Sequence, residues 1–539
     1  MLKEFLQKRQ ARVAVKLKDM LFHHIEDKMQ PLNHIVVSRN LEDNTEKVRE
    51  ILGASDDLVV REFCVGAHEQ VRAAVIYIDG LTNSEVINNF IIKSLMFETR
   101  DYEPNELFTE ETLNEKFARF ALTIGEIETV DNLSKAIKGL LAGDGIVLMD
   151  GSDKAIIPNV KGWEKRGVEE PESEHVVRGP RDGFSETLRV NTAQIRRRLQ
   201  DPDLRVKNLT VGRRTNTNVA LVYIESVADP DLVKEVERRI REIEIDGALE
   251  SGYIEQFIED SHWSPFPQLQ NTERPDKATS NILEGKVVII VDGTPFVLIA
   301  PAVFTQFYQS PEDYYERFLI ATLIRFIRIA SMIIALLLPS LYIAFTAFHP
   351  EMIPSKLVIA MAAGRATVPF PSIVEALLME ITMEILREAS VRLPGPIGPT
   401  IGIVGALVVG EAAVQAGIVS PIMVIIVALT TIGSFASPSY SAAIALRMLR
   451  FPIMFIASIF GLYGIMLVVI LIVIHLCSLK SFGVPYITPF SPRKFLDMRD
   501  SIIRVPLYWM NRRPSFMSTG DTIRTTNTAG TENKIPPKL

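Results

Sequence analysis

The sequence is poor in cysteine and contains none of the common catalytic motifs. Its two cysteines, Cys64 and Cys477, cannot form a disulfide framework, which indicates a reducing compartment for the first half of the chain. No P-loop, no glycine-rich dinucleotide fingerprint and no G-x-S-x-G elbow occurs. Histidines such as His175 and His262 have no cysteine or carboxylate at metal-ligand spacing. We therefore expect no enzymatic activity, no metal and no other cofactor.

An excess of basic charge is also missing. The formal net charge is -7, whereas a nucleic-acid-binding surface needs concentrated positive charge. The basic run 196–198 is surrounded by acidic residues, so it is interpreted as a solvated face rather than a nucleic-acid site. Residues 1–30 are basic, but no apolar run follows them, so we do not expect a signal peptide. The N-terminal half is expected to stay in the cytoplasm.

Charge is scarce throughout one long stretch, from about Arg328 to Lys480. A membrane-spanning helix needs about 20 mostly apolar residues. Three regions reach that length: 318–348, where the span begins at Ile329, 397–446, which is long enough for two spans with a break near Ser420 and Pro421, and 451–479. The sequence therefore predicts about four spans. Arg325 and Arg328 are expected to snorkel to the interface.

The basic tail after the last apolar run is expected to be cytoplasmic by the positive-inside rule. Both ends on one side require an even number of crossings, and four satisfies this condition. The same topology places Arg447 and Arg450 on the outer side, which conflicts with that rule.

A proline-broken, membrane-inserted segment is predicted at residues 357–391. Val368, Pro369 and Pro371 interrupt it before a helix over about 372–391, and non-helical backbone is tolerated in a membrane where protein or water covers it. On that helix Glu380, Glu384 and Glu388 share a face, and Glu375 lies near the same side. In a symmetric oligomer these carboxylates would form rings that select cations. Spacing alone favours the alternative, an interfacial amphipathic helix with hydrated glutamates.

A second intramembrane feature is Glu411, because a carboxyl inside an apolar span is costly and is usually functional. Gln415 lies one turn further on and could hydrogen-bond it. The alternative is a protonated glutamate that joins two helices. Gly402, Ala406 and Gly410 have small-xxx-small spacing, which predicts close packing of this helix against another.

The half before the membrane region contains a duplication. Residues 73–95 and 218–240 each have the pattern of a strand, a turn and an amphipathic helix. Residues 144–158 and 285–301 each have the pattern of a hairpin around Asp-Gly. Both pairs are about 145 residues apart, which predicts two related α/β subdomains. They could enclose a ligand in a cleft or serve as docking surfaces, and we favour docking.

The predicted fold class is an α/β soluble N-terminal half of two related subdomains, followed by an α-helical polytopic membrane domain. The predicted boundaries are a basic N-terminal helical extension at 1–56, the first α/β subdomain at 57–161, a linker at 162–209, the second α/β subdomain at 210–311, the membrane domain at 312–480 and a basic cytoplasmic tail with a disordered end at 481–539.

Motifs along most of the chain resemble the A-subunit family of spore germination receptors, the GerA family. They include LVVREF at 58–63, YIDGLTN at 77–83, VRGPRDGFSETLRVN at 177–191, PFPQLQNTERPD at 265–276, VDGTPFVLIAP at 291–301, VPFP at 368–371, EALLMEITMEILREASVRLP at 375–394 and the stretch 395–421.

The resemblance implies a multi-pass protein of the spore inner membrane, with its soluble half on the core side. It implies a complex with a transporter-like B subunit that senses the nutrient and with a lipoprotein C subunit. It also implies a homo-oligomeric ring, a pentamer, that opens to release monovalent cations and start germination. Within such a channel the pore or gate candidates are Val368, Pro369, Pro371, Glu375, Glu380 and Glu384.

Three alternatives stay open. A paralogue of the same family is tied to dipicolinic-acid release and amplifies germination. A transporter could use broken helices for alternating access, although no inverted repeat is seen among the few spans. The third alternative is a scaffold without a pore.

Overall fold

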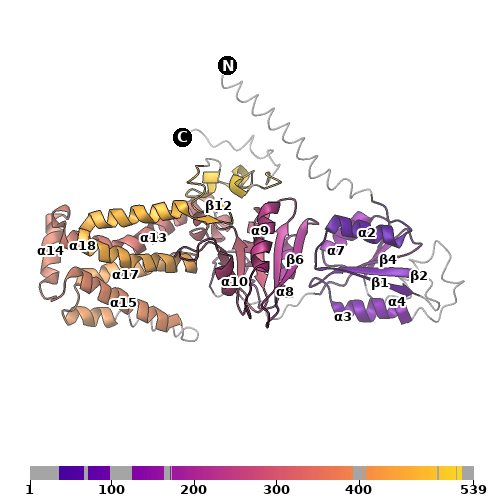
Figure 1. The fold of residues 1–539 in the computed structure, drawn as a ribbon, viewed down its shortest axis with the longest axis horizontal. Coiled ribbons are helices and arrows are strands. Elements are labelled where there is room, and N and C mark those ends of the chain that lie inside the picture. Colours follow the sequence, from indigo (N-terminus) through magenta and orange to yellow (C-terminus); the bar gives the residue numbers. More distant parts are fainter. Residues whose placement is uncertain are drawn as a thin grey trace, which may run out of the picture. The chain divides into compact units, whose positions relative to one another are not determined.

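The computed structural model describes residues 35–65, 71–97, 124, 126–162, 170–171, 173–391, 405, 408–493, 497–517 and 519–524 (Figure 1). The chain forms two compact units, which are described separately. One is a mixed α/β unit made of residues before 260, residues 269–301 and residues after 504. The other is a helical unit made of residues 260–268 and 302–504.

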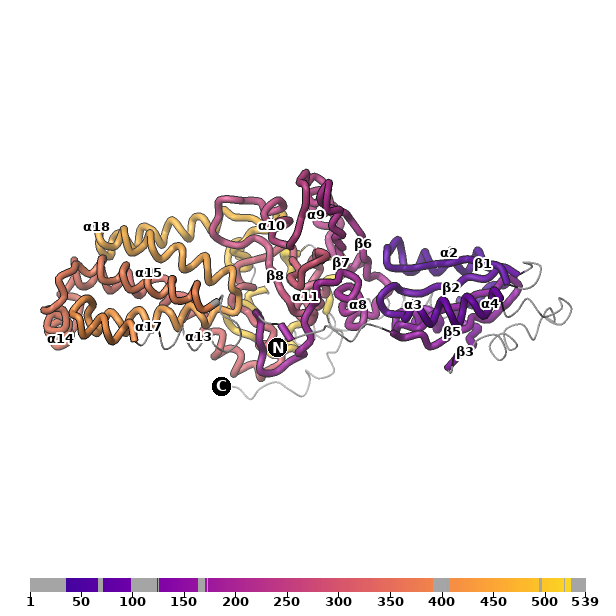
Figure 2. Tube along the Cα trace, turned by 90° about the horizontal axis from the view of Figure 1, so that it is seen from below, coloured from indigo at the N-terminus to yellow at the C-terminus, as the bar shows by residue number. Residues whose placement is uncertain are grey.

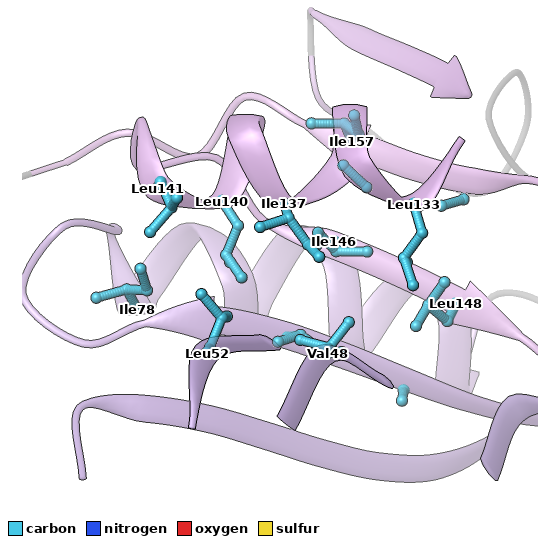
Figure 3. Packing of buried hydrophobic residues seen from close by; sticks show 14 of the residues in the cluster. Val48, Leu52, Ile78, Leu133, Ile137, Leu140, Leu141, Ile146, Leu148 and Ile157 are labelled. Atoms are coloured by element: carbon cyan, nitrogen blue, oxygen red, sulfur yellow. The ribbon is translucent and has the colours of Figure 1, made fainter. Parts of the chain in front are cut away.

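The first lobe of the α/β unit is built on a five-stranded antiparallel sheet. In sheet order its strands are β1 (Leu58–Val65), β2 (Val71–Ile78), β4 (Ile146–Met149), β5 (Ala155–Pro158) and β3 (Ile127–Val130). One face is covered by α2 (Leu41–Leu52) and α7 (Leu133–Leu141), and the other by α3 (Ser84–Val86), η1 (Ile87–Ile92) and α4 (Lys93–Phe97) (Figure 1). Figure 3 shows the first face, where Val48 and Leu140 pack over Ile146 and Leu148.

The second lobe repeats this sheet with the same strand order. Its strands are β6 (Leu204–Val211), β7 (Thr217–Ile224), β9 (Val287–Val291), β10 (Val297–Ala300) and β8 (Gln270–Thr272). Its helices are α8 (Leu188–Arg198), α9 (Pro230–Arg241), α10 (Ser251–Ile258) and α11 (Pro275–Leu283). Both predicted Asp-Gly hairpins are present, as β4–β5 and β9–β10.

The duplication extends to individual hydrogen bonds. The first helix of each lobe begins on the carboxylate of the hairpin aspartate: the Leu41 amide donates to Asp150 at 3.1 Å, and the Leu188 amide donates to Asp292 at 3.0 Å. A buried asparagine then ties each helix to the preceding turn, Asn44 to Ser38 and Asn191 to Ser185. The two lobes therefore share their long-range hydrogen-bonded frame as well as their strand pattern.

The lobes begin earlier than the sequence boundaries placed them. Leu41, Val48 and Leu52 of α2 belong to the first core, so the lobe starts well before residue 57. In the second lobe, Ile195 of α8 and Leu204 of β6 belong to the core, so much of the predicted linker 162–209 is part of the fold. The misplacement has a physical reason: burial of α2 and α8 depends on strands far away in the sequence.

The two lobes meet at a buried ion pair. Arg196 of α8 donates two hydrogen bonds to Asp57, Nε to Oδ2 at 2.8 Å and Nη2 to Oδ1 at 2.9 Å. The Ser55 hydroxyl donates to Asp57 at 2.6 Å and accepts from the Val206 amide of β6 at 3.0 Å. The Asp56 amide donates to the Val206 carbonyl at 2.9 Å. A short segment of the first lobe thus continues the hydrogen bonding at the edge of the second sheet.

The second lobe also contains a completely buried lysine. Lys286 lies at the start of β9, and its Nζ donates to Asn281 Oδ1 at 2.7 Å. Burial lowers the pKa of Lys286 to about 8, because the charged form loses its hydration. The unfolded chain keeps a pKa of about 10.4, so it binds this proton more tightly than the fold does. Stability should therefore rise as the pH increases from about 8 to about 10, and the penalty is complete below that window.

Lys286→Met is accordingly expected to stabilise the second lobe by up to about 3 kcal/mol near neutral pH. The difference from the natural protein should shrink toward about pH 10, where the folded lysine is already neutral. The measurement is a urea titration of the full chain in detergent at neutral pH and at about pH 10. Unfolding of the second lobe is monitored by the loss of protease resistance in the β9–β10 segment. Equal stabilisation at both pH values would contradict the charge-burial argument, since improved packing alone does not depend on pH.

Five longer helices of the helical unit have both ends among the described residues. They are α13 (Phe318–Ala347), α14 (Ser355–Arg365), α15 (Ser372–Val391), α17 (Pro421–Phe435) and α18 (Tyr440–Ser478). Both views show α15, α17 and α18 running along α13, with α14 at one end (Figure 1 and Figure 2). The shorter elements of the unit are η4 (Phe304–Phe307), α12 (Glu312–Tyr315), η5 (Pro350–Met352), β11 (Lys480–Ser481), β12 (Val484–Pro485) and η6 (Asp497–Asp500).

Two helices of the described chain, α13 and α18, are long and apolar enough to cross a membrane. α18 is not straight, because Gly461 has the non-helical angles φ 60° and ψ -140°. A straight helix would separate Ala442 from Leu476 by roughly 50 Å. Both residues nevertheless pack in one cluster with Phe266 and Phe307, so α18 doubles back at Gly461. It consists of two limbs, residues 440–460 and residues 462–478.

This reversal corrects the expected place of Arg447 and Arg450. They lie on the first limb of α18, which begins in the cluster that also holds the end of the second limb. Phe307, just before α13, is a member of the same cluster. The sequence-based topology placed both arginines at the opposite end, because hydropathy alone does not show the turn between α17 and α18. The number of membrane crossings stays a prediction.

Arg325 and Arg328 do not snorkel to solvent as expected. Arg325 is completely buried, and its guanidinium contacts Asp313 at 3.2 Å and the Asp500 carboxylate at 3.1 Å. Arg328 donates to Asp313 at 2.7 Å. The chain after the last helix therefore packs on the first turns of α13 instead of starting a loose tail at residue 481.

The end of the described chain packs on the second lobe of the α/β unit. It contains η7 (Leu507–Trp509) and η8 (Ser515–Met517). Arg513 donates to the Leu283 carbonyl at 2.7 Å, and the Gly520 amide donates to the Val227 carbonyl at 3.2 Å. The sequence predicted disorder beyond Ser515, but residues 516–517 and 519–524 pack in this unit. The rest of the predicted disordered end lies outside the described residues.

Candidate functional site

The turn between α14 and α15 is the first part of the candidate site, and it holds three of the predicted gate residues. Val368 is half-buried, whereas Pro369 and Pro371 are exposed. The Val368 amide donates to the Arg365 carbonyl at 3.0 Å, which closes the turn. Proline cannot continue the α14 hydrogen-bond ladder, and it restricts the residue before it to extended backbone. The sequence V-P-F-P therefore ends one helix and starts the next at Ser372.

Glu375, in the first turn of α15, is completely buried and connects three helices. Its Oε1 accepts a hydrogen bond from the Ser420 amide at 2.6 Å and another from the Ser420 hydroxyl. The Nε of Arg365, the last residue of α14, lies 3.6 Å from Glu375 Oε2. Ser420 is the N-cap of α17 and contacts the Tyr342 hydroxyl at 3.2 Å. The carboxylate thus fixes the start of α15 against the start of α17.

Further along α15 the glutamates meet arginines. Glu380 pairs with Arg450 of α18, and both side chains are 1% exposed. Glu384 pairs with Arg447 at 3.0 Å and with Arg387, one turn along its own helix, at 3.4 Å. We call these five residues the glutamate–arginine ladder. It runs between α15 and the first limb of α18, inside an otherwise apolar bundle.

A further contact ties the ladder to α17. Arg387 donates to the Ser434 hydroxyl at 3.0 Å, and its guanidinium lies 4.9 Å from the centre of the Phe435 ring. The ladder contains three guanidinium groups and two carboxylates. Among the described residues, Glu380 Oε1 and Arg450 Nε are buried without a hydrogen-bond partner. Buried charges of this kind are costly to separate, so α15 is held in one register against α18.

The structure thus places the predicted carboxylates differently from either sequence interpretation. Glu375 and Glu380 are buried and paired inside a single chain, Glu384 is partly exposed, and Glu388 is exposed. A carboxylate ring and a hydrated interfacial face both require side chains open to water. What sequence reasoning missed were the partners, of which Arg450 is the most deeply buried.

The signal for those partners was present in the sequence. Arg447 and Arg450 are three positions apart in a long apolar stretch, so they occupy one helix face. Cations in such a stretch need acidic partners. The glutamates of 375–384 are the acidic cluster in the neighbouring apolar sequence, and matching the two clusters would have suggested the ladder.

Glu411 and Gln415 are exposed on a helical stretch that includes residues 408–415. Gln415 Nε2 donates to Glu411 Oε1 at 3.1 Å, the contact expected from their spacing. Gly410 is buried, and a Cβ on it would lie 3.3 Å from Val424 of α17, so this stretch packs closely against α17. The other two small residues of the predicted packing motif, Gly402 and Ala406, lie outside the described residues.

Comparisons with known proteins identify the family. A family model described as Bacillus/Clostridium GerA spore germination protein matches residues 46–516. Spore germination protein KA of Bacillus subtilis (strain 168) is 45% identical over 490 residues, which cover 91% of this chain and 89% of that protein. Spore germination protein GerLA of Bacillus cereus is 45% identical over 486 residues, covering 90% of this chain and 97% of that protein.

Two further proteins are similar to this chain. An uncharacterized membrane protein of Bacillus subtilis (strain 168), YfkQ, is 44% identical over 485 residues, covering 90% of this chain and 93% of that protein. The crystal structure of the N-terminal domain of the A subunit of the Bacillus megaterium spore germinant receptor GerK3 is 34% identical. It covers 50% of this chain and 98% of that structure, with a TM-score of 0.39. The family match covers most of the chain, and the chain therefore belongs to the GerA family of spore germination proteins, the A subunits of germinant receptors.

Proposed function

We propose that this chain is the A subunit of a nutrient germinant receptor in the spore inner membrane, where copies of it form a pentameric ring around a gated cation pore. Family membership carries the proposal. The surface of the helical unit supports it, because large apolar side chains are exposed on several helices, among them Ile381 and Ile385 of α15 and Ile425 and Ile432 of α17. Patches of this kind normally face lipid or another protein subunit.

The proposed gate is the turn at 368–371. In a ring, the same turn from each copy would surround one axis, and Val368 would form a hydrophobic constriction that conducts when it becomes wet. Pro369 and Pro371 would fix the backbone of this constriction. Glu384, the partly exposed carboxylate of the ladder, is the carboxylate that would lie nearest the ion path.

The proposed opening is a population shift. A transporter-like B subunit would bind the nutrient, with a lipoprotein C subunit in the same complex, and binding would favour the open ring over the closed one. The glutamate–arginine ladder would keep α15 in its closed register. Opening would therefore require either movement of α15 together with α18 or exchange of ladder partners.

One alternative is supported by a specific observation. The uncharacterized membrane protein YfkQ and spore germination protein KA are 44% and 45% identical to this chain, so sequence identity does not favour one of these relatives over the other. The paralogue associated with dipicolinic-acid release therefore stays a candidate. A scaffold or transporter subunit without a channel remains the negative outcome of the experiment below.

The test is ion release from potassium-loaded liposomes that contain this protein with its B and C partners, recorded on addition of candidate nutrients. Nutrient should trigger release from the natural complex. Val368→Ala should release potassium without nutrient, because a smaller side chain lowers the barrier to wetting. Glu384→Gln should reduce the preference for cations, because it removes a carboxylate near the ion path.

Val36→Ala is the matched control, since Val36 is exposed in the first lobe and lies outside the helical unit. It should behave like the natural protein. An assembled ring that conducts with neither nutrient nor Val368→Ala would contradict the channel proposal. In that case dipicolinic-acid release would be measured with the proteins of the dipicolinic-acid release machinery as partners. This measurement would distinguish the paralogue from the scaffold.

A further inference from the structure

The loop formed by residues 260–268 belongs to the helical unit, although the sequence on both sides of it folds in the α/β unit. It is fastened to the end of α18 and to the residues that follow. The Ser264 hydroxyl lies 3.0 Å from His475 Nε2, in the last turn of α18. The Ser481 hydroxyl donates to the Gln268 carbonyl at 2.6 Å, and the Phe482 amide donates to Asp260 at 2.6 Å. We call this segment the 260–268 loop.

The loop is also closed on itself. The Ser261 amide donates to Gln268 Oε1 at 2.9 Å, and Gln268 Nε2 donates to the Ser261 carbonyl at 2.7 Å. Phe266 points inward, where it is buried beside the His475 ring with 6.2 Å between the ring centres. The conformation of the 260–268 loop is therefore fixed by its internal hydrogen bonds and by its contacts with α18.

Trp263, between these fixed points, is 98% exposed. A tryptophan side chain normally contributes to a core or an interface, because its burial removes a large apolar area from water. The rigid loop instead presents it outward. The exposure of Trp263 therefore favours contact with a partner beyond the described residues, and its position in the helical unit indicates the kind of partner.

The loop lies at one end of the apolar bundle. Phe266 packs with Leu476 and Leu479 at the end of the second limb of α18. That limb, residues 462–478, is roughly 25 Å long, close to the hydrocarbon thickness of a bilayer, about 30 Å. At the same end, in the first turns of α13, Leu319 and Leu323 are strongly exposed. Trp263 therefore stands where the exposed apolar surface of the bundle ends.

We propose that Trp263 inserts into the headgroup region of the bilayer and that the 260–268 loop is an interfacial anchor. Tryptophan suits this place because its ring is apolar while its N–H needs a polar partner, and it is enriched at membrane interfaces for that reason. The anchor would set the depth of the end of α18 in the bilayer. The hydrogen bonds from Ser264 to His475 and from Ser481 to Gln268 would hold the loop to that end of the helix. This inference rests on the proposed membrane location.

The experiment uses a full chain whose single tryptophan is Trp263, made by Trp163→Phe and Trp509→Phe, in liposomes of phosphatidylcholine. The lipids are brominated either near the headgroup or near the chain ends. We expect most of the Trp263 emission to be lost with bromine near the headgroup and little to be lost with bromine near the chain ends. Aqueous iodide should quench it weakly. Trp263→Phe in this single-tryptophan background should abolish the emission, which assigns the quenched signal to Trp263.

Flotation of the liposomes on a density gradient is measured in parallel, so that failure of the anchor and failure of membrane insertion are distinguishable. If the protein floats and resists carbonate extraction while iodide quenches Trp263 fully, the anchor is wrong and the membrane location stands. Protection from both iodide and brominated lipid would mean that another protein surface covers Trp263, which also overturns the inference. A protein that does not float would overturn the membrane location itself.

Discussion

Replacing Arg450 by methionine is expected to destabilise the helical unit by about 3–5 kcal/mol. Arg450 and Glu380 are both almost completely buried, so the variant leaves a carboxylate without its countercharge inside an apolar bundle. Glu380 Oε1 already has no hydrogen-bond partner among the described residues, which means that the remaining oxygen cannot compensate for the loss. The expected result is a large drop in the midpoint of unfolding in detergent.

The double variant with Glu380→Gln and Arg450→Met should recover most of this loss. Replacing a buried ion pair by neutral groups of similar volume is often neutral or stabilising, because the desolvation of both charges disappears. Arg447→Met serves as the control, since Arg447 faces the partly exposed Glu384 and should cost less. The measurement is a double-mutant cycle on unfolding in detergent. A coupling free energy near zero would show that the ladder does not hold α15 against α18.

The ladder also shows where sequence-based prediction stops. Apolar length located the part of the sequence that holds α13, α17 and α18, because hydropathy is a local property, but the predicted boundary at 446–451 falls inside α18. It could not show that α18 reverses at Gly461, since a glycine in an apolar run is common and the reversal is defined by contacts between distant ends. The pairing of Glu380 with Arg450 spans 70 positions, beyond the reach of helix-face arguments within one segment.

In the α/β unit, most of the fold could be predicted from local sequence signals. Alternating apolar residues and Asp-Gly turns are local signals, and they correctly predicted both hairpins and the repetition of the lobe. The edges of the lobes were misplaced because α8 resembles a solvated helix: it ends in Arg196, Arg197 and Arg198. Their charge suggested water for all three, whereas Arg196 is buried against Asp57 of the other lobe.

Replacing Arg196 by methionine is expected to destabilise the junction between the lobes by about 3–5 kcal/mol. Asp57 would then be buried without its two charged hydrogen bonds, and the Ser55 hydroxyl would lose one of its partners. Hydrogen exchange on the full chain should show faster exchange at the amides of 55–57 and β6, while the hairpins at the centre of each sheet keep their protection. Asp57→Asn combined with Arg196→Met should restore much of the stability, because no unpaired charge remains.

The chain supplies two matched controls for this prediction. Arg197 is the next residue on α8 and is exposed, so Arg197→Met should change stability by less than about 0.5 kcal/mol. Arg49 occupies on α2 the position that Arg196 occupies on α8, and it is exposed as well. Arg49→Met should therefore be equally mild. Arg49 and Arg196 would then differ in their effect on stability, although they occupy equivalent positions in the two lobes, because only Arg196 is buried against the other lobe. A large effect of Arg49→Met would instead mean that the position matters within each lobe, and the ion pair would not be what joins the two.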